Sequence, residues 1–164
     1  GGVFDALPAI DDESFAFPVA VSVADFDGDG DLDLVVVNDE GDSVTTLLGD
    51  GRLEFTFASE SVVGSFPESV TVGDYNGDGR ADVATASFFD DKLVVLSGSG
   101  DGNFETPLDL ATGRGPRSVA TGDLDGDGAA DLASANSDDG SVSVFLNEAE
   151  GGSATPTMPP ATPT

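Results

Sequence analysis

The sequence lacks cysteine, histidine and tryptophan, and it has only five basic residues among 164. The absence of cysteine excludes a disulfide framework and thiol chemistry. Without histidine or cysteine, a metal site must use oxygen ligands, which favours Ca²⁺ over zinc or a redox metal. No apolar run approaches the roughly 20 residues of a membrane span. No segment shows the 3.6-residue periodicity of a long amphipathic helix, so we expect almost no helix.

Acidic side chains dominate the composition. The chain contains 32 Asp and Glu residues and has a formal net charge of −27. Binding to phosphate groups requires basic patches, so we expect no nucleic-acid partner, and we also expect no membrane insertion. This charge is typical of a protein kept in solution at high salt and equally of an ordinary acidic secreted protein.

One acidic pattern, D-x-[DN]-x-D-G-x-x-D, occurs at residues 25–33, 74–82 and 123–131, at an interval of 49 residues both times. Carboxylates at positions 1, 3, 5 and 9 come close to one point, and their repulsion is costly unless a cation binds there. Glycine at position 6 allows a positive φ and a sharp turn. Position 7 varies freely, as expected if only its backbone carbonyl binds. The pattern therefore predicts Ca²⁺ loops.

Two other interpretations of this pattern are weaker. An EF-hand loop needs a bidentate Glu at position 12 and helices on both sides. Position 12 here is Val36, Thr85 or Ser134, and β-forming runs flank every loop. The other interpretation is an acidic turn that is merely solvated, and three copies at a fixed spacing argue against it.

Each acidic loop belongs to a larger repeat of short predicted strands. A proline-led alternating segment precedes the loop, an apolar segment follows it, and a polar turn and a Gly-rich turn separate two further strands. The predicted strands are 18–23, 34–37, 44–48 and about 55–57; 67–72, 83–86, 93–96 and about 104–111; and 116–121, 132–135 and 142–146. Four short antiparallel strands per unit are typical of a β-propeller blade. We predict an all-β fold of three four-stranded antiparallel blade-equivalents of about 49 residues.

The repeats divide the chain. Residues 1–149 form the repeat region and residues 150–164 a Thr/Pro-rich linker. Within the repeat region, 1–17 is expected to be the fourth strand of a preceding or closing blade, followed by repeats at 18–66, 67–115 and 116–149, the last without its fourth strand. A ring needs at least about four blades. We therefore expect either a piece of a larger propeller with further repeats, or an oligomeric ring in which two chains form a homodimer.

With these residues in view, the chain resembles the FG-GAP or VCBS repeat family, the calcium-binding propeller repeats of integrin α-subunit heads and of many secreted microbial proteins. The resemblance covers about residues 1–149. It rests on the three loops, on Phe66-Pro67 and Gly115-Pro116 before the first strands, and on Gly-Asp-Gly turns followed by Phe55 or Phe104. It implies Ca²⁺ between the first and second strands, and a binding face on the opposite rim.

The resemblance also implies three calcium sites, each with ligands at positions 1, 3, 5, 7 (carbonyl) and 9. The implied ligands are Asp25, Asp27, Asp29, Asp31 and Asp33; Asp74, Asn76, Asp78, Arg80 and Asp82; and Asp123, Asp125, Asp127, Ala129 and Asp131. Because Asn76 replaces a carboxylate and ligand charge tunes affinity, we predict that the second site is the weakest.

These observations favour a calcium-stabilised binding or adhesion module of a secreted or cell-surface, hence extracellular, protein in which Ca²⁺ is structural. The partner would be a protein or a glycan, and the candidate recognition residues are Phe88, Phe89, Lys92, Arg114 and Arg117. We expect no catalytic residues and no enzyme activity, because no nucleophile and base pair up in the sequence. The alternatives are a non-catalytic propeller portion of a secreted carbohydrate-active enzyme and a purely architectural spacer.

Overall fold

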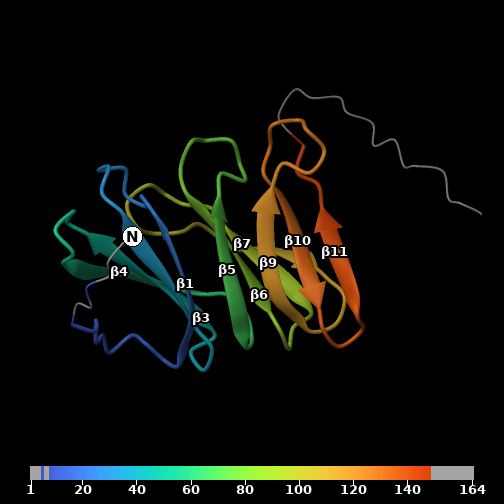
Figure 1. The fold of residues 1–164 in the computed structure, drawn as a ribbon, viewed down its shortest axis with the longest axis horizontal. Helices are drawn as coiled ribbons and strands as arrows, with labels where there is room; N and C mark the ends of the chain where they lie inside the picture. The colour runs from blue at the N-terminus through green and yellow to red at the C-terminus, as the bar shows by residue number, and fades with distance from the viewer. Residues whose placement is uncertain (1–4, 6–7, 149–164) are drawn as a thin grey trace, which may run out of the picture.

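The computed structural model describes Asp5 and residues 8–148. These residues form eleven strands in three antiparallel sheets that stand side by side in a row (Figure 1). The first sheet contains β1 (Pro18–Ala24), β2 (Asp33–Asn38), β3 (Ser43–Gly49) and β4 (Phe55–Val62). The second contains β5 (Pro67–Gly73), β6 (Asp82–Ser87), β7 (Lys92–Leu96) and β8 (Leu108–Ala111). The third contains β9 (Pro116–Gly122), β10 (Asp131–Asn136) and β11 (Ser141–Phe145). We call them blades 1, 2 and 3.

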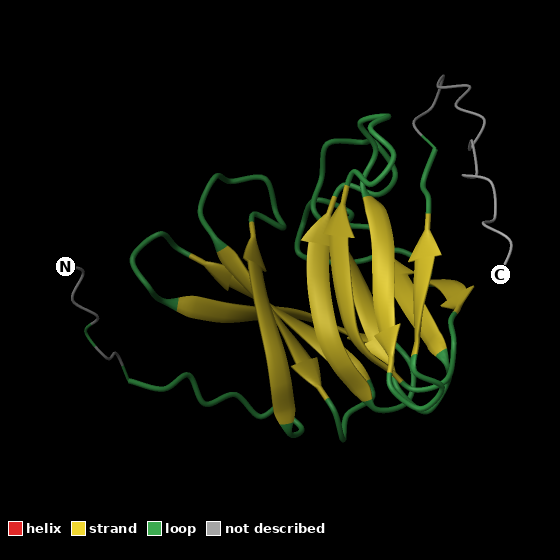
Figure 2. Ribbon diagram, turned by 45° about the vertical axis from the view of Figure 1, so that its right-hand side comes forward, coloured by secondary structure: helices red, strands yellow, loops and turns green. Residues whose placement is uncertain are grey.

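The prediction of an all-β fold built from propeller-type blades is confirmed. Strands follow one another in sequence order across each sheet, and the described residues contain no helix (Figure 2). It follows that the described part of the chain also has no helix long and apolar enough to cross a bilayer.

Proline opens the first strand of every blade. Pro18, Pro67 and Pro116 are the first residues of β1, β5 and β9, which are edge strands of their sheets. Proline is tolerated there because the missing N–H would not have joined the ladder. The following strands, β2 and β6, are interior strands made largely of β-branched and small residues, and most of their residues are buried.

Neighbouring blades pack face to face. One core cluster joins Val35, Val37 and Val44 of blade 1 to Val83 and Val94 of blade 2. A second cluster forms in the same way between blades 2 and 3 and includes Ala84, Ala86, Leu93, Val95, Val119 and Leu132. Strand β5 lies between β1 and β9, so the first strands line the inner side of the row. The chain's core is therefore two repetitions of one contact between blades.

The two ends of the repeat region differ from complete blades. The third sheet has three strands in the order β11-β10-β9. The expected fourth strand at 1–17 is absent where the structure describes it: Asp5 and residues 8–17 form no strand, and residues 1–4 and 6–7 lie outside the described residues. The segment 8–17 runs beside blade 1, at the far end of the row from β11 (Figure 1), which is too distant for pairing with β11. The linker 150–164 also lies outside the described residues.

Candidate metal centres

The three acidic loops connect the first and second strands of their blades, at the same end of the strands. In the first loop, the Asp25 carboxylate accepts hydrogen bonds from the backbone N–H groups of Gly28 (2.7 Å) and Gly30 (3.0 Å). Asp74 and Asp123 accept the equivalent pairs of hydrogen bonds in their own loops. The backbone of each loop thus wraps around the carboxylate of its own position 1 residue.

Position 6 requires glycine. Gly30 has a φ of 94°, in the left-handed region that side chains rarely adopt, and an added Cβ would meet nothing within 4 Å. The requirement is therefore backbone conformation rather than space. Gly79 (82°) and Gly128 (92°) have the same conformation. All three loops consequently turn in the same way.

Carboxylates converge in the first and third loops. One oxygen from each of Asp25, Asp27 and Asp29 lies within 4.8 Å of the others, and Asp123, Asp125 and Asp127 form the same group. Oxygen-only sets of this kind are suited to a hard cation such as Ca²⁺. The structure thus brings together positions 1, 3 and 5 of these two loops, as the sequence predicts.

Repulsion within the first group affects Asp27. The Asp29 N–H donates to the Asp27 carboxylate and by itself lowers its pKa. Partial burial and the charges of Asp29, Asp33 and Asp25 act in the opposite direction, and together they raise the pKa of Asp27 above its ordinary value. A bound cation would reverse this effect, since it favours the ionised carboxylate.

The second loop has the same conformation with less negative charge. The Asn76 Oδ1 accepts the Asp78 N–H at 2.9 Å, and its Nδ2 donates to Asp78 Oδ2 at 3.1 Å. Arg80 forms an ion pair with Asp78 at 3.6 Å. Two carboxylates and one amide therefore occupy positions 1, 3 and 5, and a cation next to them would also face the Arg80 guanidinium. The prediction that this site is the weakest remains a prediction.

Position 9 has a role that the sequence interpretation missed. The Asp33 carboxyl is fully buried and accepts hydrogen bonds from Phe26 N–H (2.7 Å) and Gly49 N–H (2.8 Å). Asp82 and Asp131 are also fully buried and accept two matching bonds each, from Tyr75 and Gly98 and from Leu124 and Asn147. Position 9 therefore ties the loop to the end of the third strand. A carboxylate has further lone pairs, so this role is compatible with a cation ligand.

The position 7 residues donate within the loop. The N–H groups of Asp31, Arg80 and Ala129 bond to the position 5 carboxylates at 2.8, 2.9 and 2.8 Å. Their side chains differ completely, which agrees with a role for the backbone alone. Coordination by their carbonyls remains a prediction.

The opposite ends of the strands carry an aromatic cluster. The Phe66 ring lies 4.9 Å from Phe89 and 6.3 Å from Phe88, and the Arg117 guanidinium stacks 4.2 Å above the Phe88 ring. Arg117 also pairs with Glu68. The structure thus unites three of the five predicted recognition residues and adds Phe66. The position of Phe66 directly before a first-strand proline, as in Phe17, was the available signal.

Two predicted recognition residues lie apart from that cluster. Lys92 pairs with Asp109 (2.9 Å) on the neighbouring strand β8 and with Asp90 (3.9 Å). The backbone N–H of Arg114 donates to Asp139, and the Arg114 charge contributes to the lowered pKa of Asp139, after hydrogen bonds from Ser141 and Arg114 itself. Lys92 thus pairs with local carboxylates, and Arg114 contacts Asp139 through its backbone.

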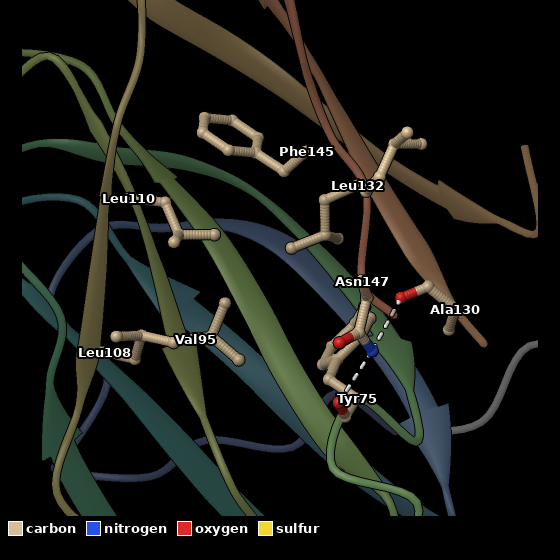
Figure 3. Close-up of a pocket in the computed structure, with 9 residues that line it drawn as sticks. Tyr75, Val95, Leu108, Leu110, Ala130, Leu132, Phe145 and Asn147 are labelled. Atoms are coloured by element: carbon tan, nitrogen blue, oxygen red, sulfur yellow. Dashed lines mark hydrogen bonds between the residues drawn. The ribbon is translucent and has the colours of Figure 1, made fainter. Parts of the chain in front are cut away.

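An apolar pocket of about 350 Å³ opens between blades 2 and 3 (Figure 3). Its wall includes Leu110, Leu132 and Phe145, and its edge is held by Asn147, which donates to the carbonyl of Tyr75 at 2.7 Å. In the contact between blades 1 and 2, the residue equivalent to Tyr75 is Phe26, which packs edge-on against Phe104. The pocket therefore lies where the first contact has an aromatic pair.

The comparisons with known proteins agree with this repeat geometry. The profile of the FG-GAP-like repeat matches residues 25–85 and 74–134, so that each match begins at the first Asp of a loop and runs through the next loop. The chain belongs to the FG-GAP-like repeat family. The matches begin directly after β1, cover the rest of blade 1 and all of blade 2, and reach into β10, and the third FG-GAP-like loop falls within the second match.

No curated protein matches the chain. One solved structure that it resembles is described as the structural basis of specific recognition of non-reducing terminal N-acetylglucosamine by an Agrocybe aegerita lectin. The two are 21% identical, with a TM-score of 0.45, over 77% of this chain and 38% of the lectin. The FG-GAP-like chain thus spans less than half of that lectin's length.

Proposed function

We propose that this chain is a calcium-stabilised binding module in which Ca²⁺ has a structural role. The observation that carries the proposal is the convergence of Asp25, Asp27 and Asp29 on a loop that the backbone holds in one conformation, repeated at Asp123. The residues at positions 1, 3 and 5, with position 7 carbonyls and position 9 carboxylates, would supply the oxygen ligands that Ca²⁺ prefers.

The energetic reason for a structural ion is charge. The folded chain concentrates carboxylates in the loops while its net charge is −27. A cation that binds only the folded state stabilises it by mass action and removes part of this repulsion. Affinities on the order of 10⁻⁴ to 10⁻³ M suffice for extracellular modules. We therefore also propose a secreted or cell-surface location, where calcium is plentiful.

Thermal unfolding in EDTA, in Ca²⁺ and in Mg²⁺ tests the ion's role. We expect Ca²⁺ to raise the Tm, and calorimetric titration to give three sites per chain. Asp27→Asn should reduce the Ca²⁺-dependent rise, whereas Asp11→Asn makes the same change at an exposed position outside the loops and should not. Equal responses of the two variants, or no Tm response to Ca²⁺, would show that the loops are merely solvated turns.

We propose that the aromatic cluster of Phe66, Phe88, Phe89 and Arg117 forms part of the ligand-binding face, for a protein or a glycan. Phe89 is 64% exposed in a chain with a net charge of −27, and stacked aromatic and Arg side chains are typical of recognition surfaces. The proposed role is binding rather than catalysis: the chain has no His or Cys, and the carboxylates gathered in the three loops are assigned to the cation.

Binding of the wild-type chain and of a cluster variant to an array of glycans and protein ligands tests this face. Phe89→Ser should abolish binding to every ligand that the array identifies for the wild-type chain. Leu53→Ser is the matched control, because Leu53 is 65% exposed on a turn outside the cluster. Any ligand bound equally well by both variants would place recognition elsewhere on the module.

A further inference from the structure

Equivalent residues of the three first strands differ sharply in exposure. Val21, Val70 and Val119 are spaced 49 residues apart and occupy the same position in β1, β5 and β9. Val119 is 6% exposed because it packs against blade 2, and Val70 is partly buried against blade 1. Val21 is 61% exposed. Val21 is thus exposed because, unlike Val70 and Val119, it has no preceding blade packed against it.

The other end of the row shows the converse. Leu93 and Val95 of β7 are 0% and 6% exposed, since they pack against blade 3. Their equivalents in β11, Val142 and Val144, are 68% and 55% exposed. Blade 3 therefore presents to solvent the same apolar face that blade 2 buries.

We call the side of blade 1 that faces away from blade 2 the leading face, and the side of blade 3 that faces away from blade 2 the trailing face. Cross-strand pairing defines them. The leading face consists of Val21, Val23, Leu34, Val36, Thr45 and Leu47, with Phe57 and Glu60 added by β4, and the trailing face of Ser118, Ala120, Ala133, Ala135, Val142 and Val144. The trailing face set contains no charged residue, in a chain with 32 acidic residues, whereas the leading face includes Glu60 on β4, opposite Thr45. On the leading face Val36, Thr45 and Leu47 are already buried within the single chain, while Val21 and Val23 of β1 are 61% and 56% exposed. Exposed valines side by side on one strand are suited to burial rather than to water.

We propose that the trailing face of one chain binds the leading face of a second copy through the exposed Val21 and Val23, in the same orientation as the two internal blade contacts. The two faces are the two halves of a contact that the chain already makes twice, between blades 1 and 2 and between blades 2 and 3. A copy of the same chain therefore supplies a matching surface. Because the contact is head-to-tail, two such contacts close two chains into a six-bladed ring. This inference depends on the blades and not on the proposed ion or ligand.

Native mass spectrometry and light scattering of the full chain in millimolar Ca²⁺ give the first test. We expect twice the 16.4 kDa chain mass at tens of micromolar protein. A single-chain mass under these conditions would overturn the proposal.

Variants on the two faces give the second test. Val144→Asp and Val21→Asp should each weaken dimerisation by at least tenfold, whereas Leu53→Asp adds the same charge at a turn that is 65% exposed and lies outside both faces. The equivalents of these two valines, Val95 and Val119, share one core cluster, so Val21→Lys combined with Val144→Asp should restore the dimer. A dimer that neither single variant weakens would contradict the proposal. Unchanged circular dichroism would confirm that both variants fold.

Mixing separates head-to-tail association from a symmetric one. A chain with Val21→Asp retains its trailing face, and a chain with Val144→Asp retains its leading face. An equimolar mixture should therefore recover a two-chain species through one intact contact, although each variant alone is monomeric. If the mixture remains monomeric, association does not use the proposed pair of faces.

Discussion

The backbone N–H of Gly49, at the end of β3, donates a 2.8 Å hydrogen bond to the buried carboxyl of Asp33, at the start of β2. A Cβ at Gly49 would lie 2.4 Å from the carbonyl oxygen of Leu32, which is too close for any side chain. The same relationship joins Gly98 to Asp82, where the Cβ would lie 2.2 Å from the Ala81 carbonyl oxygen. Glycine here allows the third strand to approach the acidic loop.

The first prediction follows from this approach. Gly49→Ala should lower the free energy of unfolding by about 1–3 kcal/mol, because backbone must move to admit the methyl group. Gly122→Ala is the control, since a Cβ at Gly122 meets nothing within 4 Å, and it should change stability by less than about 0.5 kcal/mol. Urea unfolding measures both. Similar losses for the two variants would mean that the approach at Gly49 is not restrictive.

The second prediction concerns Asp131 without calcium. Asp131→Asn should lower the free energy of unfolding by about 1–3 kcal/mol in EDTA. The carboxyl accepts hydrogen bonds from two N–H groups, and in the variant one of these donors would face an amide NH₂. Asp11→Asn should be nearly neutral. If Asp131→Asn destabilises only when Ca²⁺ is present, position 9 is a ligand and has no independent structural role.

The third prediction concerns the second loop. Asn76→Asp restores a third carboxylate and should strengthen Ca²⁺ binding at that loop on the order of tenfold, or about 1.4 kcal/mol. In the absence of Ca²⁺ the same change adds repulsion and should lower the Tm. Calorimetric titration and unfolding in EDTA measure the two effects. Equal occupancy of the three wild-type loops at limiting Ca²⁺ would contradict the expected order.

The fourth prediction is the pH dependence in EDTA. Burial, followed by the charges of Glu68, Glu40 and Asp42, raises the pKa of Asp39. Burial, together with the Asp78 charge, outweighs three backbone hydrogen bonds and raises the pKa of Asp82. Above the ordinary value of 3.8, the folded state therefore holds protons that the unfolded state has lost. Stability should fall as pH rises through this window.

Thermal unfolding between pH 4 and pH 7 measures this trend. The carboxyls of Asp12 and Asp139 have lowered pKa values, so their contribution is lost only as pH falls below 3.8 and does not oppose the trend. Asp39→Asn should reduce the slope. A Tm that rises steadily from pH 4 to pH 7 in EDTA would contradict the assignment.

Much of the fold follows from the sequence because its determinants are local. The prolines at 18, 67 and 116 mark the first strands, and the alternating segments after them are β1, β5 and β9. The loops repeat the same residues, so their conformation repeats as well. The fourth strand of blade 2 was placed less well: β8 begins at Leu108, and Phe104 makes only an isolated bridge to Gly98.

Contacts that depend on distant residues were not predictable. The Asp33 carboxyl accepts a hydrogen bond from the N–H of Gly49, 16 residues away, and nothing in the motif distinguishes that carboxyl from a simple ligand. Phe66 joins Phe88, Phe89 and Arg117 only because the residue before β5, the turn after β6 and the start of β9 meet at that rim. Sequence spacing along one strand carries no information on such meetings.

The sequence by itself determined the number of repeats, the family, the positions of the acidic loops and nearly every strand, since each of these depends on residues close together in the chain. Only the tertiary structure decided which side of each sheet is buried. Val21 and Val119 occupy equivalent positions in similar strands, yet one is 61% and the other 6% exposed. The reason is physical: burial depends on the neighbouring sheet, and blade 3 has one on that side while blade 1 does not.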